Sequence, residues 1–337
     1  MASPGTLALA TRGLRKSYGS RLALDGLDLS VPSGVVYGFL GPNGAGKTTT
    51  MRLLTGLLHP DAGSIELLGS PFTRADRRRL FEVGALVESP SFYPYLSGRA
   101  NLAAIAADGA PVPKGRIEEL LDLVGLRERA RDKVSGYSLG MKQRLGIAGA
   151  LLSDPKLLLL DEPANGLDPA GIVAMRETLR HLAASGKTVF VSSHLLAEVQ
   201  VLADVVGIIA RGKLVREGPL ESLLTDQGVV RVRVTRAEAD GARAALEPLA
   251  PVAATPGAIP GATPAEGTAD QWLTVHVEPT RAAEVNRALA AAGIYASGLE
   301  SGTDLELLFL ELTGGEASSE GRMQGIGDLG GPTGASS

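Results

Sequence analysis

The chain has 337 residues, of which 44% are hydrophobic, and it carries a formal net charge of −4 with no cysteine. This length predicts two domains and a tail, while the missing cysteines exclude disulfides, thiol catalysis and cysteine-based zinc sites. The acidic balance argues against a nucleic-acid partner, and no apolar run reaches the roughly 18 residues that a membrane-spanning helix needs.

The first 60 residues predict strands, a glycine-rich loop and a helix. Short strands are expected at 7–9 and 27–31, on either side of a turn-rich segment. Residues 35–40 form a continuous apolar run, which is typical of a buried central strand. That run leads into a glycine-rich loop at 41–49 and then into a helical pattern at 51–58.

The loop at 41–49 matches the phosphate-binding pattern Gly-x-x-x-x-Gly-Lys-Thr in full. Glycines let backbone N–H groups approach phosphate oxygens, and the next helix adds the positive end of its dipole. Lys47 can reach the β- and γ-phosphates, and the Thr48 hydroxyl can bind magnesium. A glycine-rich turn without a ligand is the alternative, but the strand before it and the helix after it favour phosphate binding. The candidate nucleotide-binding residues here are Gly41, Pro42, Asn43, Gly44, Ala45, Gly46, Lys47, Thr48 and Thr49.

Helical patterns dominate 89–136, and strand patterns return at 157–160, 188–192 and 205–210. Strands that alternate with helices predict an α/β fold with a mainly parallel sheet covered on both faces. The helical stretch is then an insertion into this α/β layer.

The segment Ser138-Leu139-Gly140 comes directly after this insertion and opens another helix. Its hydroxyl and its backbone N–H groups can be offered to a phosphate. A buried strand that ends in two carboxylates follows it in the chain. Few nucleotide-binding proteins carry both elements in this order, and together they indicate ATP hydrolysis between two subunits.

Three candidate catalytic or metal-binding residues stand where predicted strands end. Asp161 follows four leucines, and ligands bind at this edge of open α/β sheets, so Asp161 can hold magnesium. Glu162 can polarise the attacking water as a general base. His194 follows another apolar strand and can contact the γ-phosphate. In isolation the carboxylates would only cap a turn and the histidine would be structural, but the phosphate loop upstream favours the functional interpretation.

The C-terminal third has the pattern of a second, smaller α+β domain at 228–312. Valines and arginines alternate at 230–234, as in a half-exposed strand, and 272–277 is similar. A proline-rich linker separates these strands, and a helix is expected at 284–292. Residues 314–337 are rich in glycine and poor in apolar side chains, so we expect a disordered tail.

The ordered set of motifs resembles the nucleotide-binding subunit of ATP-binding cassette (ABC) transporters, over about two-thirds of the chain. The resemblance implies a P-loop NTPase core at 1–225 with an inserted helical subdomain at about 89–136. It also implies that Tyr18 stacks on adenine, that Asp168 belongs to the D-loop, and that His194 is the switch histidine.

By the same resemblance, Ser138, Leu139 and Gly140 form the family signature, which contacts the γ-phosphate held by the opposite subunit. The usual signature is Leu-Ser-Gly-Gly-Gln, and this chain keeps the Ser and the second Gly but has Met141 in place of the Gln. Methionine cannot make the hydrogen bonds of a glutamine. Glu88 stands where the family usually has a Gln that touches magnesium. It keeps an oxygen ligand but adds a charge, so the implied metal ligands are Thr48, Glu88 and Asp161.

The segment around Glu88 and the small C-terminal domain look like those of the exporter branch that handles bacitracin and lantibiotics. This implies an ATPase that uses ATP and Mg²⁺ to power efflux of a drug, peptide antibiotic or related amphiphile. The implied partners are an integral membrane permease and a second copy of the chain. The implied location is the cytoplasm, peripheral on the inner face of the cell membrane, and the N-terminus shows no secretion signal.

Two other functions compete with transport. A cassette ATPase that acts in DNA repair or on ribosomes usually has a long coiled-coil insertion or two cassettes, whereas this chain has one cassette and a short helical insertion. A small-molecule kinase would use the same phosphate loop, but it would leave the signature and His194 unexplained.

Overall fold

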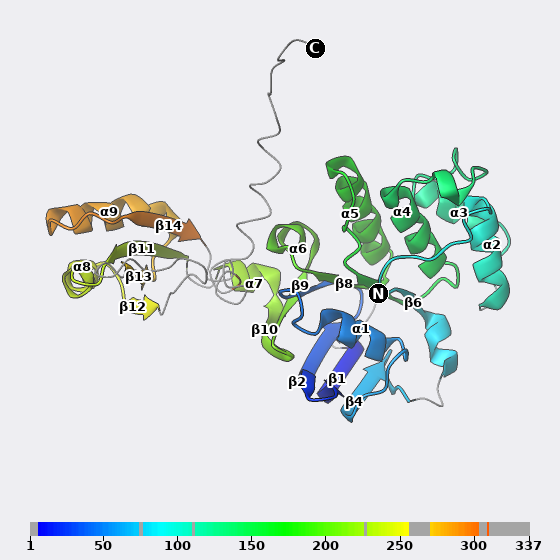
Figure 1. Ribbon diagram of the computed structural model, residues 1–337, viewed down its shortest axis with the longest axis horizontal. Helices are drawn as coiled ribbons and strands as arrows, with labels where there is room; N and C mark the ends of the chain where they lie inside the picture. The colour runs from blue at the N-terminus through cyan, green and yellow to red at the C-terminus, as the bar shows by residue number, and fades with distance from the viewer. Residues whose placement is uncertain are drawn as a thin grey trace, which may run out of the picture. The chain divides into compact units, whose positions relative to one another are not determined.

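The computed structural model describes residues 6–73, 77–109, 112–225, 228–255, 270–302 and 309 (Figure 1). The chain forms two compact units, Met1–Glu221 and Ser222–Ser337. Most of the proline-rich linker and the tail expected at 314–337 lie outside the described residues. Within the described part of the chain, no helix has the length and apolar character that crossing a membrane requires.

The centre of the first unit is a six-stranded sheet in the order β10-β9-β3-β8-β7-β6. Its strands pair in parallel apart from β10, which is antiparallel to β9. This topology confirms the predicted α/β core. The strands are β3 (Val36–Leu40), β6 (Val83–Leu86), β7 (Leu157–Asp161), β8 (Thr188–Ser193), β9 (Val205–Ala210) and β10 (Lys213–Pro219).

The four leucines of β7 show why this sheet is covered on both faces. Leu157 and Leu159 belong to one buried cluster, whereas Leu158 and Leu160 belong to another. All four are fully buried. Because successive side chains of a strand point to opposite faces, a continuous leucine run is stable only between two apolar layers.

One face of the parallel sheet packs against α1 (Lys47–Leu54) and a four-stranded antiparallel sheet in the order β2-β1-β4-β5. The strands expected at 7–9 and 27–31 are each twelve residues long and pair with each other as a hairpin. The expectation was too short because the later residues of β1 alternate less regularly, with several register shifts along the pair. The strands are β1 (Leu7–Tyr18), β2 (Arg21–Pro32), β4 (Ala62–Leu67) and β5 (Ser70–Pro71).

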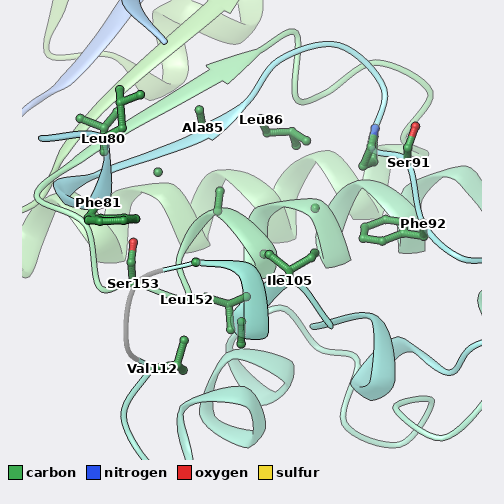
Figure 2. A pocket seen from close by; sticks show the side chains of 18 residues that line it. Leu80, Phe81, Ala85, Leu86, Ser91, Phe92, Ile105, Val112, Leu152 and Ser153 are labelled. Atoms are coloured by element: carbon green, nitrogen blue, oxygen red, sulfur yellow. The ribbon is translucent and has the colours of Figure 1, made fainter. Parts of the chain in front are cut away.

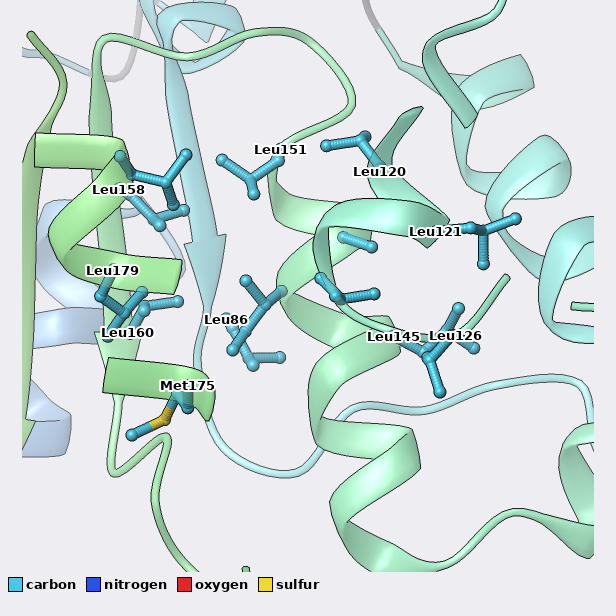
Figure 3. Close-up of a cluster of buried hydrophobic side chains, with 14 of the residues drawn as sticks. Leu86, Leu120, Leu121, Leu126, Leu145, Leu151, Leu158, Leu160, Met175 and Leu179 are labelled. Atoms are coloured by element: carbon cyan, nitrogen blue, oxygen red, sulfur yellow. The ribbon is translucent and has the colours of Figure 1, made fainter. Parts of the chain in front are cut away.

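The opposite face packs against α5 (Pro169–Ala184) and α6 (Leu196–Leu202). Beyond the edge strand β6 lie three helices, of which α4 contacts both β6 and the other two. Figure 3 shows Leu120, Leu145 and Leu179 as members of one buried cluster that extends from these helices to the sheet. The three helices are α2 (Gly98–Asp108), α3 (Arg116–Leu123) and α4 (Leu139–Ala150), and α7 (Leu220–Thr225) follows β10.

The second unit is an antiparallel sheet in the order β12-β13-β11-β14, with two helices. The valines of β11 are buried against these helices, as the alternating pattern predicts. Arg231 was expected on an exposed face but is only 8% exposed, because its guanidinium stacks over the Trp272 ring at 5.0 Å. The elements are β11 (Val229–Thr235), α8 (Ala239–Leu246), β12 (Val252–Thr255), β13 (Asp270–Val275), α9 (Ala282–Ala291) and β14 (Gly298–Gly302).

Candidate active site

The glycine-rich loop connects the C-terminal end of β3 to the first turn of α1. Gly46 immediately precedes α1 with φ +115°, in the region that favours glycine, and a Cβ there would lie 2.9 Å from Ala23 O. Lys47 is 6% exposed and folds back over the loop, where its Nζ donates to Gly41 O at 2.7 Å and to Pro42 O at 3.3 Å. The ammonium therefore lies within the curve of the loop, where a phosphate would need it.

Asp161 and Glu162 lie at the end of β7, two strands from β3 in the sheet. Ser192 of the neighbouring strand β8 joins them: its Oγ donates to Asp161 Oδ1 at 2.5 Å and accepts from Glu162 N at 3.0 Å. Glu162 has φ +48°, a conformation that costs free energy for a residue with a side chain. This turn directs Glu162 out of the strand.

The Glu162 carboxylate lies between a lysine and a histidine from two other parts of the chain. Its Oε1 is 3.2 Å from Lys47 Nζ, and its Oε2 is 2.7 Å from His194 Nδ1. The three residues follow β7, β3 and β8, whose C-terminal ends meet at one edge of the sheet. The structure thus brings together Lys47, Glu162 and His194, which the sequence placed 32 or more residues apart. The Lys47–Glu162 ion pair has no signal in the local sequence around either residue.

This arrangement is suited to hydrolysis of a phosphoanhydride. The loop and Lys47 can bind the phosphates, and a carboxylate next to them can accept a proton from water. Among the described residues, no three acidic or histidine side chains gather as a metal site. Asp161 and Thr48 carry oxygen donors of the kind that magnesium prefers, so these two side chains would suit such an ion.

Ser138 and Asp168 lie elsewhere in the same unit, and each caps a helix. Ser138 Oγ accepts from Met141 N at 3.2 Å at the start of α4, and Asp168 Oδ1 accepts from Gly171 N at 3.1 Å at the start of α5. The two helix starts are adjacent. Gly166, two residues before Asp168, lies so close to Leu139 that a Cβ there would be 2.2 Å from Leu139 Cδ2.

The strand order of the sheet separates helix α4, which begins with Leu139-Gly140 after its cap Ser138, from the phosphate loop. Helix α4 contacts β6 at the sheet edge, whereas the loop follows β3, and β8 and β7 lie between them. Three strand spacings amount to roughly 14 Å. Three strand positions therefore separate the strand that α4 contacts from the strand that precedes the phosphate loop.

Tyr18 and Glu88 are more exposed than the rest of the candidate site. Tyr18 ends β1 and is 43% exposed, as a stacking residue would need to be. Glu88 has φ +65° and forms an ion pair with Arg52 of α1. The pKa of Arg52 is raised above its ordinary value, mainly by the hydrogen bond and the charge of Glu88 and to a smaller extent by Tyr18. The family resemblance implied Glu88 as a metal ligand, but the sequence offered no signal for its pairing with Arg52.

An open pocket lies beside this segment, between β6, α2 and α4. Figure 2 shows apolar side chains around it, including Phe81, Phe92 and Ile105. Phe81 and Ile105 are among the exposed large hydrophobic residues of the chain. Exposed apolar surface of this kind often marks a protein contact.

Comparisons with known proteins place these features in context. A family model described as "ABC transporter" matches residues 24–165, within the first unit. The bacitracin transport ATP-binding protein BcrA of Bacillus licheniformis is 48% identical over 216 residues, which are 64% of this chain and 71% of that protein. The lantibiotic transport ATP-binding protein SrtF of Streptococcus pyogenes is 44% identical over 209 residues, which are 62% of this chain and 90% of that protein. A solved ATP-binding subunit of an ABC transporter is 29% identical with a TM-score of 0.58, and the match covers 65% of this chain and 92% of that one.

Proposed function

Because the chain belongs to the ATP-binding, ATP-hydrolysing subunits of ABC transporters, we propose that it powers export of a drug, peptide antibiotic or related amphiphile through a separate permease. The transport functions for which the bacitracin and lantibiotic relatives are named support this cargo class. The observation that carries the ATPase chemistry is the Glu162 carboxylate, held between Lys47 and His194. No comparison favours DNA repair or a ribosomal function.

In this proposal, nucleotide binding releases Glu162. In the structure, Lys47 Nζ contacts both the loop carbonyls and Glu162 Oε1. When ATP binds, the β- and γ-phosphates bind this ammonium in place of Glu162. Loss of that ion pair frees Oε1 to accept a proton from the attacking water. Bound ATP therefore frees Glu162 to act as the general base, because its phosphates compete with Glu162 for Lys47 Nζ.

His194 keeps the freed carboxylate in place. Its Nδ1 faces Glu162 Oε2 and donates to it when it carries the proton. The carboxylate thus retains one fixed oxygen while the other turns to water. The other ring nitrogen, Nε2, is then available to a γ-phosphate oxygen.

We assign Thr48 and Asp161 as the holders of a magnesium ion, with Glu88 a further candidate on family resemblance. When bound, such an ion neutralises charge on the transferred phosphate. The chain's own part is to keep Asp161 buried and oriented, which Ser192 Oγ does. The Arg52 pair must open before Glu88 can join such a site.

Two further contacts complete the proposal. A second copy supplies Ser138, Leu139 and Gly140 to the γ-phosphate, as the family resemblance implies, and the position of α4 at the β6 edge of the sheet supports this arrangement. The permease occupies the apolar pocket of Figure 2, because Leu86 and Pro90 line that pocket and flank Glu88 in the chain. This would place the protein at the membrane through its partner.

Resistance measurements test the proposed function. A strain without this chain should become more sensitive to bacitracin-like or lantibiotic-like compounds. The wild-type chain, expressed with its own permease, should restore resistance, whereas Lys47→Ala should not. Unchanged sensitivity across such compounds, together with co-purification with ribosomes or DNA, would contradict export.

A further inference from the structure

Residues 192–194, at the end of β8, contact the phosphate loop and both carboxylates of the candidate active site. Ser192 and His194 bond to the two carboxylates at the end of β7, Asp161 and Glu162. Ser193, between them, is 2% exposed, and its backbone oxygen accepts from Gly41 N at 3.2 Å. One short segment therefore sets the positions of the phosphate loop and both carboxylates relative to each other.

Glu198, in the first turn of α6, holds the middle residue of this segment. Ser193 Oγ donates to Glu198 Oε2 at 3.0 Å and accepts from Leu195 N at 3.0 Å. Glu198, Ser193 and Arg176 are the polar side chains of an otherwise apolar pocket between α5, α6 and the sheet. Pro163, the residue after Glu162, lines the same pocket.

The helix that carries Glu198 is closely fitted to the sheet. A Cβ on Gly38 of β3 would lie 2.5 Å from Val199 Cγ1, so α6 has no room to move towards β3. Burial raises the pKa of Glu198, the Ser193 hydrogen bond lowers it, and the charge of Glu162 raises it further. His194 and Arg176 lower it by smaller amounts. A carboxylate held at a cost in a mainly apolar pocket indicates a specific role.

We propose that Glu198 is a positioning residue for ATP hydrolysis: by accepting the Ser193 hydrogen bond, it fixes His194 and Glu162 in the geometry that turnover needs. This inference rests on the proposed roles of Glu162 and His194. Glu198 acts through Ser193 rather than on the nucleotide. Its loss should therefore lower kcat for ATP while leaving KM nearly unchanged.

The alternative is a purely structural role, in which an acidic residue in the first turn stabilises α6 through the helix dipole. Kinetics on the full-length chain distinguish the two. Glu198→Ala and Ser193→Ala should each lower kcat about tenfold to 100-fold with ATP affinity retained, since small displacements of catalytic groups have such effects. Glu198→Gln should restore kcat, because its amide oxygen can accept the same hydrogen bond. Glu177→Ala, which removes an exposed glutamate from α5, is the matched control.

The double variant Ser193→Ala/Glu198→Ala should be no slower than either single variant, because both remove one interaction. Wild-type kcat in Glu198→Ala, equal losses in the Gln and Ala variants, or a multiplicative loss in the double variant would overturn the inference. Glu162→Gln is measured in parallel. If it is inactive while Glu198→Ala is normal, only this inference fails; if Glu162→Gln turns over normally, the proposed base fails and the inference fails with it.

Discussion

At the scale of single residues, Glu162 occupies an unusual place. Its backbone has a positive φ, which costs of order 1–3 kcal/mol for such residues. Both of its carboxylate oxygens have partners, Lys47 on one side and His194 on the other. The strain turns the side chain out of β7 to the point where these two residues meet. The backbone strain at Glu162 therefore lowers the stability of the fold slightly while it positions the carboxylate in the site.

Lys47→Ala removes the ammonium that we assign to the β/γ-phosphates. We expect ATP to bind roughly tenfold to 100-fold more weakly, which corresponds to the loss of one charge-assisted hydrogen bond. Titration with a fluorescent ATP analogue measures this change. Lys156→Ala removes an exposed lysine and should leave the affinity unchanged. Equal affinities for the wild-type and Lys47→Ala chains would contradict the assignment.

The raised pKa of Glu198 gives the folding stability a pH dependence of known sign. Burial is its main cause, and the folded chain therefore holds this proton more tightly than the unfolded chain. The free energy of unfolding then falls as pH rises from the ordinary glutamate pKa of 4.5 to the raised pKa of Glu198 in the folded chain. Relative to wild type, Glu198→Gln should gain stability between about pH 4 and about pH 7, since its amide does not titrate. Urea unfolding at both pH values tests this, and a constant difference would contradict it.

At the scale of elements, local sequence predicted the residues that end each strand better than the contacts those residues make. The sequence identified the glycine-rich loop after β3, the carboxylates at the end of β7 and the histidine after β8. It could do so because open α/β sheets bind ligands at the carboxyl ends of their strands. Ser192, Glu198 and Arg52 could not be identified in this way. Ser192 depends on which strands become neighbours, Glu198 on the close approach of α6 to β3, and Arg52 on an ion pair between α1 and the segment after β6. No local pattern encodes these contacts.

Asp168 shows how a helix start can serve two purposes. Asp168→Ala removes the side-chain cap of α5 and should lower the free energy of unfolding by about 1 kcal/mol, whereas Asp168→Asn can still cap. Denaturant unfolding separates the two variants. If the Asp168 charge also acts across two copies, the Asn variant should be stable but slow in ATP hydrolysis. Equal destabilisation of both variants would contradict the capping role.

At the scale of the whole molecule, the first unit carries the complete set of candidate residues, but in two separate places. The phosphate loop, both carboxylates and His194 lie at the ends of central strands, while Ser138 lies beyond the sheet edge on α4. The second unit has its own buried core and contributes none of these residues. The two groups of candidate residues therefore belong to different elements of the first unit, as the proposed sharing between two copies requires.

The mass in solution of the Glu162→Gln chain, with and without ATP, tests the central claim that two copies share each hydrolysis site. Glutamine cannot act as the base, so bound ATP should persist and hold two chains together. Light scattering should then report the mass of one chain without nucleotide and of two chains with ATP and magnesium. Adding Ser138→Arg should keep the single-chain mass although ATP still binds. A single-chain mass for Glu162→Gln in saturating ATP, or a dimer that survives Ser138→Arg, would contradict the account.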